Sequence, residues 1–273
     1  YTTRALLVND DPAGRERDFR YAVELNPDER LLRIPLIQHL QATGNWDEAV
    51  RASKSAIEIF PRDFDLALLH VRSLNELGRY DESIRIMHDI QVLPSEHSLE
   101  AHQLFSDAQV MAGLGALERG EFEVADDHFF MAMTWPERLG QGRPYSPEER
   151  LPRFLIALSR WLSGDSEGAS RAWTAVVDAT PDSVFLGESA TRLDLLGALS
   201  LEALGKQEEL NNFGDVGVGA LAPVANLVRV ASRAGESIAH AVAATSSETD
   251  EIFDDVQGRL IKEVLGFWSQ VVR

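Results

Sequence analysis

Apolar side chains recur along most of the chain with the three- to four-residue spacing of one helix face. This pattern predicts helices over residues 31–43 and 46–59, and a similar pair over residues 66–77 and 81–92. No segment shows the sustained alternation of apolar and polar positions that is typical of a half-buried strand. The sequence therefore predicts an all-α protein.

The predicted helix pairs follow one another with a period of thirty-four residues. Pro27 returns as Pro61, and Gly44 returns as Gly78. A fixed short period is typical of stacked helix pairs, each of which buries its apolar face against its neighbours. We expect Gly44 and Gly78 to end the first helix of each pair, because glycine tolerates the left-handed backbone that closes a helix.

The second helices carry a series of small, aromatic, small and proline residues. One copy is Ala125, Phe129, Ala132 and Pro136. In this series the chain resembles tetratricopeptide repeat proteins. The resemblance implies an α-solenoid over residues 1–210, closed by non-repeat capping helices over residues 211–273. The residues that carry it are Ala22, Pro27, Gly44, Ala49, Ala56, Pro61, Gly78, Gly120, Ala125, Phe129, Ala132, Gly164, Ala169, Trp173 and Pro181.

A segment rich in proline and glycine interrupts the repeats at residues 135–147. This stretch and the predicted helix after it resemble the C-terminal tetratricopeptide region of large bacterial proteins, whose N-terminal region is β-rich, uncharacterised and carbohydrate-related. That resemblance implies that the chain is the helical part of such a protein. An ordinary loop between two repeats is the alternative interpretation.

The repeat is lost beyond residue 210. Glycine-rich and small polar segments flank a predicted helix over residues 221–242, and a last helix is predicted from residue 250. Its apolar stripe, which includes Val264, Leu265 and Trp268, is too wide for a free surface helix. It either caps the repeats or faces a partner, including a second copy of the chain in a homo-oligomer.

Charge and composition narrow the classes of partner. The net charge is −18, from 26 basic and 44 acidic residues, which argues against nucleic acid and anionic membrane surfaces. The chain has no cysteine, so disulfides, thiolate metal sites and a cysteine nucleophile are excluded. No apolar run is long enough to cross a bilayer. We expect a cytoplasmic protein with no membrane partner.

The sequence offers no convincing catalytic or metal-binding group. No two histidines lie three or four residues apart, as a zinc site on one helix would require, and we predict neither metal nor cofactor. The acidic pairs Asp47-Glu48 and Asp81-Glu82 occupy the same repeat position, which favours a helix-start role over catalysis. We therefore favour a protein that is not an enzyme. A helical module of a carbohydrate-active enzyme, with tryptophans that stack on sugars, is the alternative.

The resemblance implies a binding groove lined by the first helix of each pair. We predict that this groove binds a peptide or protein segment, so that the chain acts in protein–protein interaction or scaffolding, including in cis with an N-terminal domain. Phe154, Leu158 and Trp161 form a helical stripe that is either core or an exposed anchor. The predicted groove residues are Gln38, Gln41, Arg72, Asn75, Glu118, Phe154, Leu158 and Trp161.

Overall fold

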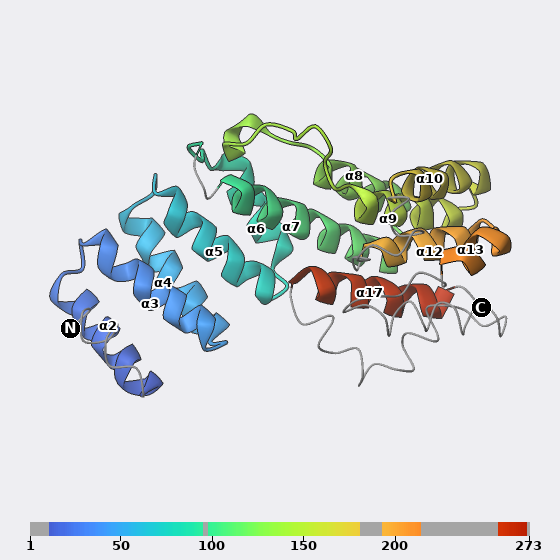
Figure 1. Cartoon of the computed structure of the whole chain (residues 1–273). Coiled ribbons are helices and arrows are strands. Elements are labelled where there is room, and N and C mark those ends of the chain that lie inside the picture. Colours follow the sequence, from blue (N-terminus) through green and yellow to red (C-terminus); the bar gives the residue numbers. More distant parts are fainter. Residues whose placement is uncertain (1–10, 95–97, 181–192, 214–255, 272–273) are drawn as a thin grey trace. The chain divides into compact units, whose positions relative to one another are not determined.

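The computed structural model describes residues 11–94, 98–180, 193–213 and 256–271, and within them every regular element is helical. Neighbouring helices pack against each other in sequence order (Figure 1). The prediction of an all-α protein is confirmed. The α-helices are α2 (Pro12–Leu25), α3 (Arg30–Ala42), α4 (Trp46–Ile59), α5 (Phe64–Glu76), α6 (Tyr80–Asp89), α7 (Ser98–Glu118), α8 (Phe122–Ala132), α9 (Arg150–Leu162), α10 (Ser166–Asp178), α12 (Asp194–Ala203), α13 (Gln207–Phe213) and α17 (Val256–Val271).

One type of turn joins the two helices of each pair. At the end of α3 the Asn45 N–H donates to the Leu40 carbonyl at 2.8 Å, and Gly44 between them has φ of 71°. The same hydrogen bond and positive φ recur after α5, α7, α9 and α12. The turn satisfies carbonyls that the helix end leaves without a partner, and glycine adopts it without a steric cost. The helix ends predicted at Gly44 and Gly78 are confirmed.

The second helices begin with acidic residues, as the sequence predicts. Asp47 and Glu48 lie in the first turn of α4, and Asp81 and Glu82 lie in the first turn of α6. Negative charge is favourable there because the exposed N–H groups make a helix start partly positive.

Predictions for Pro181, the helix over residues 221–242 and the start of the last helix fall outside the described residues.

The chain divides into two compact units. Unit 1 comprises Tyr1–Ala112 and Thr134–Tyr145, and unit 2 comprises Gly113–Met133 and Ser146–Arg273, so the division falls within α7. In both units the small and aromatic signature residues of the second helices are buried. They are Ala22, Ala49 and Ala56 in unit 1, and Ala125, Phe129, Ala132, Ala169 and Trp173 in unit 2.

The interruption of the repeats packs on unit 1. The Val92 N–H donates to the Arg138 carbonyl at 2.8 Å, and Leu139 is buried in the same core cluster as Phe105. Gly140 has φ of 76°, and a Cβ there would lie 3.0 Å from the Val92 carbonyl oxygen. Only glycine fits this approach. The segment therefore completes a core formed by residues about fifty positions earlier, which the sequence alone did not predict.

The last helix, α17, covers part of unit 2. Its buried residues are Leu260, Ile261, Val264, Leu265 and Trp268. The sequence left two alternatives for this apolar stripe, namely capping of the repeats or contact with a partner. In the structure, these described residues pack against the same chain. Self-association through residues 250–273 stays a prediction.

Candidate functional site

A small hollow lies on the first helices of unit 1. It has a volume of about 160 Å³ and is formed by side chains of α3, α5 and the start of α7. Leu68 and Leu69 give it an apolar floor, and both are buried. Its remaining lining residues are Ile34, Gln38, Asp65, Arg72 and Glu100.

Ion pairs between neighbouring helices position the charged walls of this hollow. The Arg72 Nη2 atom of α5 lies 2.5 Å from Glu100 Oε1 of α7. Arg30 of α3 binds both Asp63 and Asp65 at the start of α5. Each carboxylate that lines the hollow thus has a guanidinium beside it. These ion pairs hold the charged side chains in fixed positions in the wall of the hollow.

Two of the predicted groove residues of unit 1 line this hollow and two do not. Gln38 is exposed and lies with Arg72 in its wall. Gln41 is buried, and its Nε2 donates to the Leu69 carbonyl at 2.8 Å and to Ser73 Oγ at 2.9 Å. Asn75 donates to the Leu104 carbonyl at 3.1 Å. Both amides join adjacent first helices, and Gln41 therefore does not face a ligand as predicted.

Two of the four predicted groove residues of unit 2 are buried and two are exposed. Phe154 and Leu158 are fully buried, so that the core alternative holds for them. Trp161 keeps 36% of its surface exposed, and its ring centroid lies 6.4 Å from that of Trp268. Glu118 is exposed at the end of α7.

Unit 1 contains a buried acid, Asp107, that no pattern in the sequence indicates. Asp107 of α7 is 8% exposed, and Gln103 Nε2 donates to its Oδ1 at 2.7 Å. Burial raises the pKa of Asp107 from 3.8 to about 6, and the negative charge of Glu76 on α5 adds to this while Gln103 opposes it. A helical aspartate resembles any surface acid in sequence, and its burial is visible only in the folded structure.

The raised pKa of Asp107 makes a pH-dependent prediction. The unfolded state ionises this acid near pH 3.8 and the native state near pH 6, so native stability falls as pH rises between these values. Asp107→Asn should remove a penalty on the order of 2–3 kcal/mol at neutral pH. We expect the stability gain of the variant in urea unfolding to be larger at pH 7.5 than at pH 4.5. A gain that is equal at both values would contradict the shift.

His70, whose pKa burial lowers to about 4, acts in the opposite direction: native stability falls as pH drops from 6.5 toward 4. Comparison of Asp107→Asn with the unmodified chain at each pH cancels this contribution, because His70 is present in both proteins.

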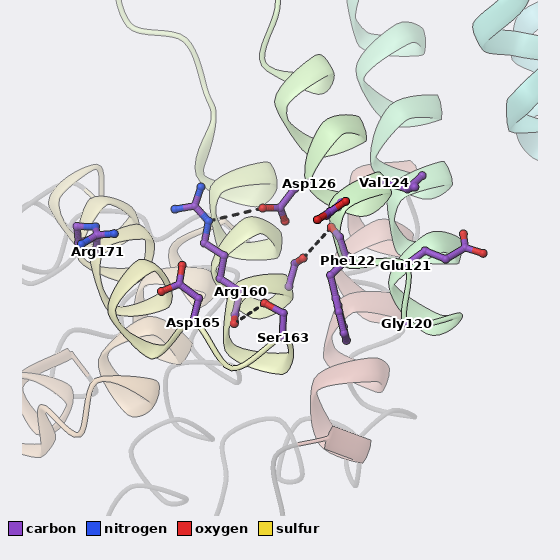
Figure 2. Close-up of a pocket in the computed structure, with 11 residues that line it drawn as sticks. Gly120, Glu121, Phe122, Val124, Asp126, Arg160, Ser163, Asp165 and Arg171 are labelled. Carbon is purple, nitrogen blue, oxygen red and sulfur yellow. Dashed lines mark hydrogen bonds and ion pairs between the residues drawn. The ribbon is translucent and has the colours of Figure 1, made fainter.

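Unit 2 carries a wider and more open hollow, of about 810 Å³ (Figure 2). Arg160 of α9 points toward Asp126 of α8, but the two charged groups are 3.6 Å apart. Asp126 Oδ1 is buried without a hydrogen-bond partner. Carboxylates outnumber guanidinium groups among the lining residues, which are Gly120, Glu121, Phe122, Glu123, Val124, Asp126, Ser159, Arg160, Ser163, Asp165 and Arg171. None of the predicted groove residues lies among them.

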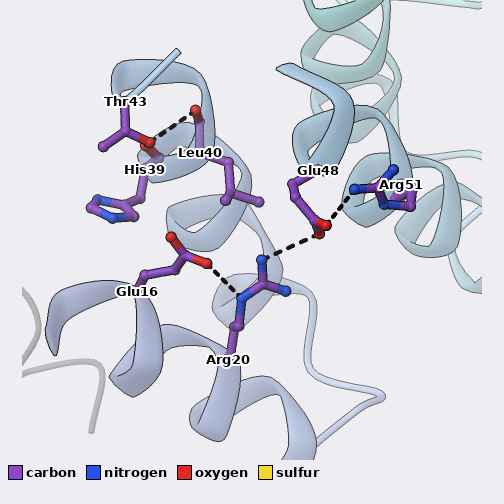
Figure 3. Close-up of polar contacts among 7 residues, drawn as sticks. All are labelled: Glu16, Arg20, His39, Leu40, Thr43, Glu48 and Arg51. Atoms are coloured by element: carbon purple, nitrogen blue, oxygen red, sulfur yellow. Dashed lines mark hydrogen bonds and ion pairs between the residues drawn. The ribbon is translucent and has the colours of Figure 1, made fainter. Parts of the chain in front are cut away.

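A polar cluster joins α2 to α4 in unit 1 (Figure 3). Arg20 Nε lies 2.8 Å from Glu16 Oε1, and Arg20 Nη2 lies 3.3 Å from Glu48 Oε2. Arg51, and secondarily Arg20, hold the pKa of Glu48 below its usual range. Because these charges are satisfied between successive helices, the cluster supports helix packing rather than chemistry.

The described residues offer no group of three or more histidine, aspartate or glutamate side chains that could hold a metal ion. In the same part of the chain, no helix is both long and apolar enough to cross a membrane. Three of the five tryptophans are used in packing: Trp173 and Trp268 are buried, and Trp135 stacks on His102 with ring centroids 3.4 Å apart. The Trp173 and Trp268 rings are therefore not available to stack on a sugar, whereas Trp135 is only half-buried.

Comparison with known proteins gives no family. No family model matches the chain, and no curated protein is significantly similar to it.

Proposed function

We propose that this chain is a tetratricopeptide-type α-solenoid that acts as a non-catalytic protein-interaction module, and that the first helices of unit 1 bind a partner segment. The observation that carries the proposal is the hollow shared by α3, α5 and α7, which is lined by Gln38 and Arg72 together with the apolar Leu68 and Leu69. Helical-repeat proteins bind their partners on a surface that extends over successive repeats. A hollow formed by three successive first helices is part of such a surface. The recurring turns after each first helix support the repeat type.

The hollow favours a particular kind of contact. Its volume of about 160 Å³ suits one or two side chains rather than a whole small-molecule substrate. Leu68 and Leu69 would contact an apolar side chain, while Gln38 can donate to and accept from a partner's backbone. The net charge of −18 steers a basic or neutral segment toward the chain and repels an acidic one.

Site-specific photo-crosslinking tests this proposal. A benzophenone amino acid at position 38 of the full chain should give discrete adducts with a partner in cells of the source organism. We expect Arg72→Ala, combined with the same photoreactive residue, to reduce their yield about fivefold or more, because a contact in the wall of the hollow is lost.

The matched control places the photoreactive residue at position 54, where Lys54 is exposed on a second helix of the same unit. Identical adducts from positions 38 and 54, or adducts that do not respond to Arg72→Ala, would show that the face is not a specific binding surface. Circular dichroism of each variant separates loss of binding from loss of folding.

A further inference from the structure

In unit 2, the last helix packs against two of the residues that the sequence assigns to a binding groove, Phe154 and Trp161. The Trp268 ring of α17 lies among three aromatic rings. Its centroid is 5.2 Å from Phe154 and 6.4 Å from Trp161 on α9, and 5.9 Å from Trp173 on α10. Two predicted groove residues therefore contact a helix of the same chain.

The helix α17 packs on unit 2 as an amphipathic helix, with one apolar face buried and one charged face exposed. The buried positions of α17 follow the helical spacing i, i+1, i+4, i+5 and i+8. Its other face carries the exposed residues Arg259, Lys262 and Glu263. A single apolar stripe with one large aromatic anchor is the usual pattern of a helix that binds in a groove.

The fit of α17 is incomplete in its hydrogen bonds. The indole N–H groups of Trp268 and Trp173 are both buried and neither has an acceptor. A buried donor without an acceptor has lost its hydrogen bond to water without replacing it. This desolvation cost destabilises the packing of α17 on unit 2. The same aromatic cluster therefore combines a large apolar contact with two unmet polar groups.

The charges between α17 and α7 are also mismatched. The negative charge of Glu118 on α7 acts on Glu263 and disfavours its ionised form. Desolvation raises the pKa of Glu263, and Glu118 raises it further, while Arg259 acts in the opposite direction. The docked helix thus places the Glu263 carboxylate under the influence of a like charge on α7.

From these contacts we propose that α17 is a displaceable occupant of unit 2, and that an amphipathic helix of a partner protein binds in its place. The favoured partner helix has an aromatic anchor for the Phe154, Trp161 and Trp173 cluster, and a basic residue opposite Glu118. An acceptor beside the Trp173 indole would complete the site. The proposal concerns unit 2 alone and does not depend on partner binding by unit 1.

Native-state hydrogen exchange on the full chain tests displacement directly. If α17 is displaceable, its amides exchange through an opening that costs less than the opening of α9 and α10, and that responds little to denaturant. If the amides of α17 and α9 exchange through one common opening, α17 is an integral part of the fold and the proposal is overturned.

Substitutions at position 263 refine this test without removing the aromatic anchor. Glu263→Lys in the full chain should slow exchange in α17, because repulsion with Glu118 becomes attraction. Glu208→Lys, an exposed charge reversal on α13, is the matched control and should leave exchange in α17 unchanged. Equal effects of the two substitutions on exchange in α17 would show that the net charge of the chain, rather than repulsion between Glu263 and Glu118, controls this exchange.

A peptide competition identifies the partner chemistry. The probe is a fluorescent 16-residue peptide with the sequence of α17 and lysine in place of Glu263. It should bind a full chain carrying Trp268→Ala about tenfold tighter than the unmodified chain, because the competing helix is weakened. Should Trp268→Ala fail to fold, Trp268→Phe replaces it and a smaller gain is expected.

Two further peptides complete the design. A peptide that also lacks the tryptophan should not bind, and one that retains glutamate at 263 should bind more weakly. No binding of the lysine peptide to any of the chains, or equal binding of all three peptides, would overturn the proposed site. The photo-crosslinking result at position 38 is unaffected by either outcome, so the two proposals fail separately.

Discussion

Arg150→Leu is expected to lower the free energy of unfolding of unit 2 by about 3 kcal/mol or more. Arg150, at the start of α9, is 6% exposed and binds Asp194, which starts α12 and is 2% exposed. Its Nη2 also lies 2.6 Å from Glu148 Oε2. The substitution would leave the Asp194 carboxylate buried without this guanidinium, and burial of a charge is costly when its ion partner is removed.

Urea unfolding followed by tryptophan fluorescence measures this effect, because three of the five tryptophans, Trp161, Trp173 and Trp268, lie in unit 2. Arg171→Leu is the matched control: its ion pair with Glu167 is largely exposed, and such pairs contribute about 0.5 kcal/mol. The double variant with leucine at 150 and 194 should recover much of the stability, because both charges are gone. An unchanged free energy of unfolding in Arg150→Leu would show that the buried ion pair does not hold α9 to α12.

Gly113→Ala should destabilise unit 2 by about 1–3 kcal/mol because it overpacks the contact between α7 and α8. A Cβ on Gly113 would lie 2.4 Å from Phe129 Cε1, and the Phe129 ring is fully buried. The ring cannot move away without disturbing the core. This loss is expected even though alanine favours a helix more than glycine does.

Gly115→Ala, two residues further along α7, provides the comparison. Its Cβ would meet nothing closer than the Arg119 guanidinium at 3.4 Å, which belongs to the end of a flexible side chain. We expect a gain of up to about 1 kcal/mol, since only the helix preference changes. The sign of the difference between the two variants in the same denaturation assay is the test. A shift of both in one direction would contradict the close packing at Gly113.

Local signals explain how much of the fold could be predicted. Glycine at a helix end, an acidic first turn and the apolar period each act over a few residues, so Gly44, Gly78 and the four helices before residue 92 are readable from the chain. The predicted ranges agree with α3 to α6 within two or three residues. Helix boundaries depend on the same short-range hydrogen bonds that these residues satisfy.

The candidate site was predicted less completely because it depends on neighbouring helices. Gln38 and Gln41 lie on one helix within a single turn, yet Gln38 is exposed and Gln41 bonds to α5. Residues three apart lie about 60° apart around the helix axis, which here is enough for one amide to be exposed while the other bonds to the next helix. The raised pKa of Asp107 also depends on the fold, since burial of the side chain is its main cause.

The sequence by itself determined that the protein is helical, where its first helix pairs begin and end, and which small and aromatic residues enter the core. These properties follow from backbone geometry and apolar period, which are local. The tertiary structure decided that residues 134–145 complete the core of unit 1 and that Trp268 covers Phe154. Such contacts join residues far apart in the chain, and burial of a particular apolar surface, rather than any local preference, selects them.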